Sequence, residues 1–168
     1  LVPSPETWHY RNKMEYSFSE IRHDLETDEK VDDFGLGFKH RGTWWAVENL
    51  DADSGLFDPM VESTLHEVRT WCEATGLPAW HPPQRKGFFR FLVVRKSLAD
   101  GGLLVNLVTT SDAPLDVDGF VGLIRGLWGD RVQGILHTLN DDVGERVEAR
   151  EGQSKVIWGN STVTEVLH

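Results

Sequence analysis

Cationic and aromatic residues occur together in two parts of this sequence, and this mixture is its main chemical signal. Arg11 and Lys13 are two residues apart, so they share one face of an extended segment. A second set of cations surrounds a run rich in phenylalanine: Arg85, Lys86 and Arg90. Cationic groups neutralise phosphates while rings stack on unpaired bases, so the mixture favours contact with looped or single-stranded RNA. The alternative is that the phenylalanines belong to the core and that Arg90 pairs with an acid across a sheet.

The overall charge limits how far this signal extends. The 168 residues include 27 acidic and 17 basic side chains, a net charge of −10, whereas most proteins that bind phosphate backbones alone are basic. The segment 74–99 holds five bases and no acid, so it carries +5 and leaves −15 for the rest. Any RNA contact is therefore expected to be local.

The residue spacings give little support for metal binding, a reactive cysteine or a hydrolase site. The seven histidines show no close paired spacing, so no metal site is expected. Cys72 shares an apolar helical stripe and is expected to be a packed core thiol, not a nucleophile. Glu62 and His66 lie four residues apart and are expected to form a surface pair on one helix. No Gly-x-Ser-x-Gly motif is present, and no catalytic residue is predicted.

Alternating hydrophobicity predicts strands in the first fifty residues. Tyr10 to Phe18 alternates with charged neighbours, which predicts a half-buried strand over 9–19. The charged stretch 21–33 is expected to be a loop or a long hairpin arm. Alternation resumes over 34–38, and the Arg41-Gly42 turn leads into a further strand at 44–48.

The remaining elements alternate between helices and strands. Asp58-Pro59 begins a helix that ends at Gly76, and a second helix runs from Val117 to Gly129. Further strands are expected at 88–96, 103–110, 132–140 and 155–158, with a polar loop over 141–154. We therefore expect residues 1–168 to form one α+β domain. Its mainly antiparallel sheet would contain a ferredoxin-like β-α-β-β-α-β core plus an extra N-terminal β-hairpin.

The segment 10–18 contains a motif that resembles one of a known protein family. The stretch Tyr10-Arg11-Asn12-Lys13-Met14-Glu15-Tyr16-Ser17-Phe18 resembles the opening motif of the central domain of RNA uracil-C5 methyltransferases, which make 5-methyluridine in ribosomal and transfer RNA. Further pieces follow in the family's order: Gly35-Leu36-Gly37-Phe38, Phe91-Leu92-Val93-Val94-Arg95, Leu104-Val105-Asn106-Leu107-Val108, Gly134-Ile135 with Asn140, and Val156-Ile157-Trp158-Gly159. The resemblance covers nearly the whole chain.

The resemblance implies a three-part parent enzyme of which this chain is the central, RNA-recognising part. The N-terminal barrel and the C-terminal domain that binds S-adenosylmethionine and carries the catalytic cysteine would lie outside it. The chain itself would then be non-catalytic and hold no cofactor. Arg11 is expected to lie close to the flipped target base. The full set of expected RNA-binding residues is Arg11, Asn12, Lys13, Lys39, Arg41, Arg85, Lys86 and Arg90.

Several finer expectations accompany this assignment. Many family members that act on ribosomal RNA hold an iron-sulfur cluster, but the matching stretch here, 48–55, has no cysteine, so no cluster is expected in this segment. The substrate is expected to be ribosomal rather than transfer RNA, and the partners to be RNA and the parent's other domains, with no membrane. With one cysteine and no apolar run of about 20 residues, the chain is expected to be cytoplasmic. The alternative function is a ferredoxin-like module that senses a ligand or binds another protein.

Overall fold

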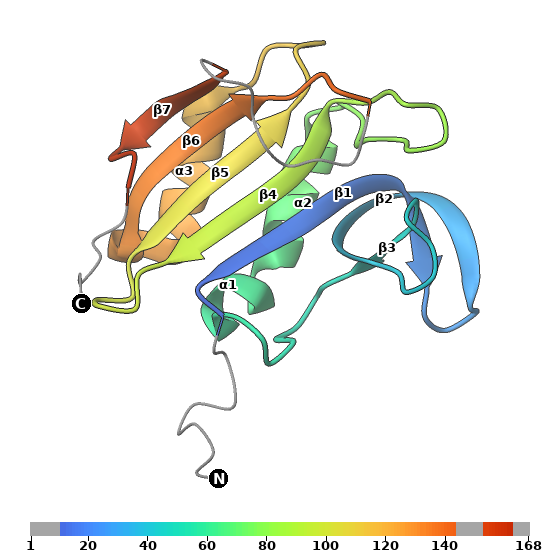
Figure 1. Ribbon diagram of the computed structural model, residues 1–168, viewed down its shortest axis with the longest axis horizontal. Coiled ribbons are helices and arrows are strands. Elements are labelled where there is room, and N and C mark those ends of the chain that lie inside the picture. The colour runs from blue at the N-terminus through green and yellow to red at the C-terminus, as the bar shows by residue number, and fades with distance from the viewer. Residues whose placement is uncertain (1–10, 144–152, 163–168) are drawn as a thin grey trace, which may run out of the picture.

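One twisted mixed sheet forms the centre of the computed structural model, which describes residues 11–143 and 153–162. Within these residues seven strands lie in the order β2-β3-β1-β4-β5-β6-β7 (Figure 1). Neighbouring strands are antiparallel except for β5–β6 and the short β1–β3 contact, which are parallel. The strands are β1 (Lys13–Asp24), β2 (Glu29–Lys39), β3 (Val47–Asn49), β4 (Phe89–Lys96), β5 (Leu103–Thr109), β6 (Val132–Leu139) and β7 (Ser154–Gly159).

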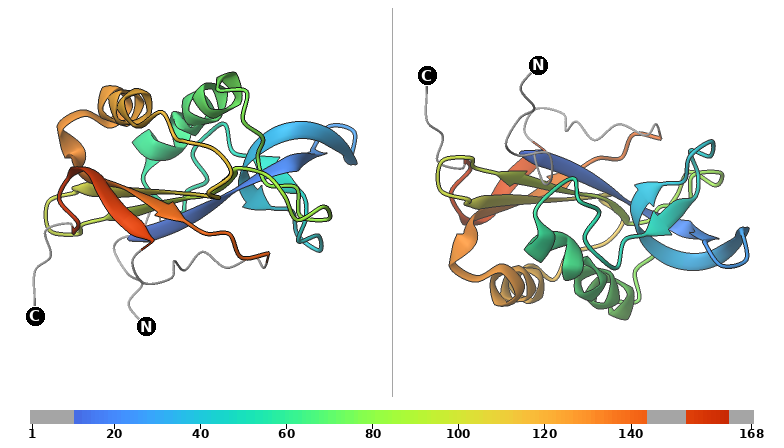
Figure 2. Two further views of the ribbon diagram at one scale, coloured as in Figure 1. Left: turned by 90° about the horizontal axis from the view of Figure 1, so that it is seen from above. Right: turned by 90° about the horizontal axis from the view of Figure 1, so that it is seen from below.

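The helices cover one face of this sheet and leave the other without helices (Figure 2). They are α1 (Pro59–Ser63), α2 (Leu65–Ala74) and α3 (Val117–Trp128), the last followed by the short 3-10 turn η1 (Gly129–Arg131). The Asp58 side chain accepts hydrogen bonds from two N–H groups of the first turn of α1, as its position before Pro59 predicts.

The first expected helix is interrupted at Thr64. The Thr64 hydroxyl donates to the carbonyl oxygen of Met60 at 2.7 Å, and it accepts from the indole N–H of Trp128 at 2.8 Å. A hydroxyl that bonds back to the preceding turn competes with regular helix geometry, so α1 and α2 are separate. Glu62 is fully buried and its carboxylate bonds to Tyr16 and Ser54, so the expected surface pair with His66 is wrong.

The charged stretch 21–33 is not a loop. It completes a long hairpin in which β1 and β2 pair from Ser17 to Asp24, and only residues 25–28 form the turn. The charges are compatible with strands because they face outward and pair across the hairpin. The Arg22 guanidinium, for example, lies 2.9 Å from the Asp33 carboxylate.

The expected fold class is confirmed as α+β, but the ferredoxin-like order is not confirmed. The parallel neighbours β5 and β6 are joined directly through α3, whereas a split β-α-β arrangement inserts a strand between the two. The sheet is therefore mixed, although most of its pairs are antiparallel.

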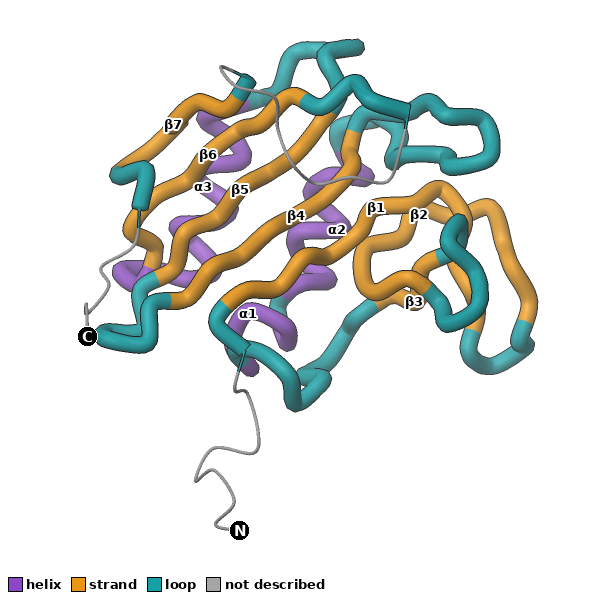
Figure 3. Tube along the Cα trace, viewed as in Figure 1, coloured by secondary structure: helices purple, strands orange, loops and turns teal. Residues whose placement is uncertain are grey.

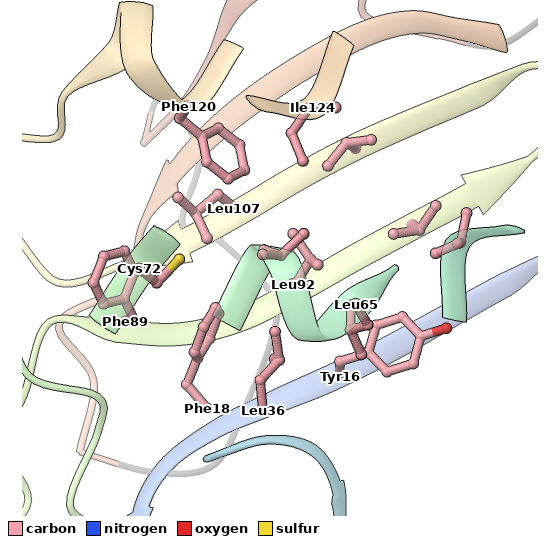
Figure 4. Packing of buried hydrophobic residues seen from close by; sticks show 14 of the residues in the cluster. Tyr16, Phe18, Leu36, Leu65, Cys72, Phe89, Leu92, Leu107, Phe120 and Ile124 are labelled. Atoms are coloured by element: carbon pink, nitrogen blue, oxygen red, sulfur yellow. The ribbon is translucent and has the colours of Figure 1, made fainter. Parts of the chain in front are cut away.

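The core lies between the helices and the sheet, and Figure 4 shows part of it. Cys72 lies there beside Phe89, fully buried, so its assignment as a core thiol is confirmed. Burial raises the pKa of this thiol. On the opposite face of the sheet three residues form a second buried cluster: Phe91, Val93 and Val108.

Candidate RNA-contacting surface

The opening motif forms the exposed start of β1. Met14 and Tyr16 point into the core beneath the helices, so Lys13 points to the opposite face of the sheet. Arg11, Asn12 and Lys13 are all exposed. The backbone holds this segment in place, because the N–H of Arg11 donates to the Leu56 carbonyl at 3.1 Å. The cations therefore lie on an anchored strand end.

Strand pairing adds a cation that the sequence reasoning left out of the site. Lys13 pairs directly with Arg95 of β4, so the two side chains share the face without helices. Arg95 is exposed, and the Lys13 ammonium lies 2.7 Å from the Glu15 carboxylate. Arg95 was visible in the basic segment 74–99, but only the register shows that it joins the motif. We call Arg11, Asn12, Lys13 and Arg95 the first-strand patch.

Lys96, the neighbour of Arg95, forms an ion pair with a buried carboxylate. Its ammonium lies 3.2 Å from the Asp58 carboxylate, which also receives two hydrogen bonds from Arg131, at 3.1 and 2.6 Å. Burial alone would raise the pKa of Asp58, but Arg131, the Val61 N–H and Lys96 together lower it to about 2. This pair therefore belongs to the framework beneath the patch.

Arg85 and Lys86 lie in a tight loop before β4. The loop closes on itself through hydrogen bonds from Arg85 N–H to the His81 carbonyl (2.8 Å) and from His81 N–H to the Lys86 carbonyl (2.7 Å). Gly87 follows with φ +140°, and a Cβ there would lie 2.3 Å from the Ala79 carbonyl oxygen, so only glycine fits. Both cations are exposed as a result.

A shallow pocket adjoins this loop. Its lining includes Glu20, Pro78, His81, Lys86 and Phe88. The Glu20 carboxylate accepts the Ala79 N–H at 2.7 Å, and burial raises the pKa of Glu20 despite this bond. The pocket thus combines apolar residues with the Lys86 ammonium and the carboxyl groups of Glu20 and Asp112.

Lys39 is the last residue of β2, and Arg41 lies in the connection between β2 and β3. The Lys39 ammonium donates to the Trp44 carbonyl at 2.7 Å, and Arg41 is exposed. Trp44 itself is 56% exposed, so this turn presents an aromatic ring beside cations. The sequence reasoning did not select Trp44, although a tryptophan just after an Arg-Gly turn was a usable signal.

Arg90 does not belong to the surface, which corrects its assignment as an RNA-binding residue. Only 1% of it is exposed, and its guanidinium stacks on the Trp80 ring at 3.9 Å from the ring centroid. It donates to the backbone carbonyls of Asn140, at 3.2 Å, and Asp142. These contacts of Arg90 are to backbone carbonyls and to an aromatic ring, and they hold the guanidinium inside the protein.

The remaining expected residues form three separate groups. The eight residues of β4 separate the first-strand patch from the 81–87 loop by about 25 Å, at about 3.3 Å per residue. The loop lies instead beside the middle of β1, because the Glu20 N–H donates to the Trp80 carbonyl at 3.0 Å. Figure 3 shows the loops that carry these groups at different ends of the sheet. Single bases cannot bridge them, but an extended or looped RNA strand can.

No helix in the described part of the chain is both long and apolar enough to cross a bilayer.

Comparison with known proteins finds RNA methyltransferases. No family model matches the chain. An uncharacterized RNA methyltransferase of Clostridium tetani is 28% identical over 165 residues, and one of Caldanaerobacter subterraneus is 30% identical over 165 residues; each match covers 98% of this chain and 34% of the relative. The tRNA (uracil(54)-C(5))-methyltransferase of Pyrococcus horikoshii is 22% identical over 99% of this chain and 35% of its own length.

A solved structure shares the fold. The crystal structure of Pyrococcus abyssi tRNA (uracil-54, C5)-methyltransferase in complex with S-adenosyl-L-homocysteine superposes with a TM-score of 0.70 over 99% of this chain and 35% of that one, at 21% identity. The chain thus spans about a third of the length of the relatives it matches. The resemblance seen in the opening motif is confirmed: the chain is similar to RNA methyltransferases, among them tRNA (uracil-54-C5)-methyltransferases.

Proposed function

We propose that this chain is the RNA-recognition segment of a cytoplasmic, S-adenosylmethionine-dependent RNA uracil-C5 methyltransferase. The first-strand patch carries the proposal. It places Lys13 beside Arg95 on the face without helices, with the exposed Arg11 of the same motif two residues earlier, in a chain whose net charge is −10. Such a cluster suits phosphate contacts around an unstacked base.

The segment is proposed to bind RNA without performing the chemistry. Methyl transfer to C5 of uracil needs a thiolate that adds to C6, and Cys72 is buried with a raised pKa. The methyl donor and the reactive cysteine are therefore assigned to parts of the parent protein outside this chain. Arg11 is proposed to contact RNA close to the target uridine, supported by Asn12 and Lys13.

The other exposed cations are proposed to guide the RNA away from the target. Arg85 and Lys86 are exposed on a tight loop, and the partly buried Lys39 and the exposed Arg41 precede the exposed Trp44. Cations that contact only phosphates position the strand, whereas a ring stacks on a splayed base. Trp44 is therefore added to the proposed contact set, and Arg90 is removed from it.

The choice of RNA differs from the sequence-based expectation. Relatives whose names state a substrate are transfer-RNA enzymes, so the expected preference for ribosomal RNA has no support from them. Both RNA classes belong in the test.

The test measures RNA binding by fluorescence anisotropy at several salt concentrations, using uridine-containing loops from transfer and ribosomal RNA. We expect Arg11→Ala and Lys13→Ala each to weaken binding and to reduce the salt dependence by about one phosphate contact. Arg69→Ala is the matched control, because Arg69 pairs with Asp51 away from the patch. The same Arg11→Ala change in the intact parent should lower methyl transfer to uridine. Equal binding and turnover by Arg11→Ala and the control would refute the assigned role.

A further inference from the structure

Three potential metal ligands from three strands meet where β1, β2 and β3 close against one another. They are His23 on β1, His40 directly after β2, and Glu48 on β3, and their ligand atoms all lie within 4.8 Å of one another. The parallel register of β1 and β3 explains the meeting: Arg22 pairs with Val47, so the next residues along, His23 and Glu48, are neighbours. Histidines seventeen residues apart are thus brought together by strand pairing alone.

The hydrogen bonds leave one nitrogen of this cluster unsatisfied. The His23 side chain is 3% exposed, and its Nε2 lies 2.8 Å from the Asp28 carboxylate. Its Nδ1 is buried without a hydrogen-bond partner, 3.6 Å from the Glu48 carboxylate. The same Glu48 oxygen lies 2.6 Å from Nδ1 of His40.

The position of the proton on the His23 ring explains why a cation would stabilise this cluster. An ionised Asp28 only accepts hydrogen bonds, so Nε2 of His23 carries the proton that it shares with Asp28. In the neutral ring Nδ1 then presents a lone pair to the Glu48 carboxylate. In that state a lone pair and a carboxylate face each other at a partly exposed site, an arrangement that a positive ion between them would stabilise.

We propose that His23, His40 and Glu48 bind a divalent transition-metal ion of the zinc type. Two imidazoles and one carboxylate are a donor set that zinc accepts, with water in the fourth position. Asp28 would act on the ligand, not on the metal, because a carboxylate on the far nitrogen fixes the ring and its tautomer. Asp28 has φ +58°, a left-handed value that aspartate adopts more readily than most non-glycine residues, in the turn that carries its carboxylate to His23.

The site needs only a small rearrangement to close on a metal. The two imidazole rings are stacked with centroids 3.6 Å apart and planes 20° apart, so the His40 ring must rotate to share an ion with His23. His40 and Glu48 are 23% and 34% exposed at their side chains, which leaves them room to move and gives the ion a route from solvent. The buried His23 would be the fixed ligand.

A bound ion would join β1, the end of β2 and β3 at one point. The turn between β2 and β3 carries Lys39, Arg41 and the exposed Trp44. The metal would therefore hold this turn in one position. The inference rests on the cluster itself and does not depend on RNA binding.

The test titrates the metal-free 168-residue chain with Co(II) and Zn(II). We expect one equivalent to bind, with visible Co(II) absorption typical of four-coordinate nitrogen and oxygen ligation, and zinc to displace the cobalt. His40→Gln and Glu48→Gln should each weaken zinc binding on the order of 100-fold or more, and Asp28→Asn by about 10-fold with the spectrum retained. These three side chains are partly or fully exposed, so the variants avoid replacing the buried His23.

His81→Gln is the matched control, because it removes a histidine outside the cluster. Circular dichroism of each metal-free variant checks that it is folded. If the chain shows no stoichiometric Co(II) binding, the cluster is an ion-pair network and the proposal is wrong. If all variants bind metal as the unmodified chain does, the ion is held elsewhere, which overturns the assignment equally.

Discussion

The carboxylates of Asp58 and Glu48 each join elements that are distant in sequence. They differ in whether the polar groups around them all have hydrogen-bond partners. Asp58 accepts two backbone N–H bonds at the start of α1 and a two-point contact from Arg131, with Lys96 also at 3.2 Å. Every lone pair of this carboxylate has a partner, and its pKa falls to about 2 although burial opposes the shift. Glu48 pairs with His40 but leaves the buried Nδ1 of His23 unsatisfied.

The interior network around Glu62 is as complete as the one around Asp58. Glu62 is fully buried, yet its carboxylate accepts from the Tyr16 hydroxyl at 2.6 Å and from the Ser54 backbone and hydroxyl. Burial and the adjacent Glu62 charge raise the pKa of Tyr16, so the phenol stays protonated and donates. Networks that satisfy all their members hold a fold together, whereas an unsatisfied buried nitrogen indicates a missing partner.

The largest expected effect comes from opening the complete network. Arg131→Ala leaves the buried Asp58 carboxylate with Lys96 as its remaining cation, and we expect the free energy of unfolding to fall by about 3 kcal/mol. The stabilisation from Asp58 is present above its usual pKa of 3.8 and is lost as pH falls toward 2, so the variant should lose less stability across that window. Urea titrations at pH 7 and pH 3 measure both effects.

Arg69→Ala is the control for this prediction, because it removes an exposed ion pair instead of a buried one. Arg69 lies 2.6 Å from Asp51, but the Asp51 side chain is 60% exposed, so we expect a change below about 1 kcal/mol. Equal losses in the two variants would show that the burial of Asp58 does not set its contribution.

A second prediction concerns His137, a buried histidine whose Nε2 has a hydrogen-bond partner. Its Nε2 lies 2.7 Å from the Thr109 hydroxyl, and burial, followed by the charge of Lys155, lowers the pKa of His137 to about 4. The unfolded chain takes up this proton near pH 6.5 and the folded chain only near pH 4. Stability from this residue is therefore present above pH 6.5 and declines as pH falls to 4, by up to about 3 kcal/mol.

Replacement by glutamine should remove that decline. Thermal unfolding of His137→Gln between pH 7 and pH 4 should show a shallower fall than the unmodified chain, and His81→Gln should not. A variant with the original slope would mean that His137 is protonated in the folded state.

The smallest effect is expected from Glu48→Gln in the metal-free chain. The His40–Glu48 pair is partly exposed, so its loss should change the free energy of unfolding by less than about 1 kcal/mol. Added zinc should raise the melting temperature of the unmodified chain but not that of the variant. A large loss without metal would make Glu48 a structural carboxylate like Asp58, and the contrast between the two sites would disappear.

Local patterns predicted those elements whose stability is local. The Asp58-Pro59 start, the helix 117–128 and strands β4 to β6 follow from caps and hydrophobic periodicity. For residues 21–33 the sequence left a loop and a long hairpin arm as alternatives, because the charged residues that pair across the β1–β2 hairpin are not revealed by composition. The break at Thr64 also depends on a distant residue, Trp128, whose indole bonds to the same hydroxyl.

The residues of the candidate surface also differ in whether local sequence was enough to predict them. Arg11, Asn12 and Lys13 were identified from one contiguous motif, and the structure exposes all three. Arg90 looked equivalent in sequence, but Trp80 and the backbone carbonyls around Asn140 bury it.

The sequence by itself determined the α+β class, the resemblance to RNA uracil-C5 methyltransferases and the cationic start of the first strand, because each depends on patterns that are local along the chain. Only the tertiary structure decided that Arg95 joins this patch and that His23, His40 and Glu48 form one cluster. Strand register sets both contacts, and register arises from pairing between segments that no local pattern connects.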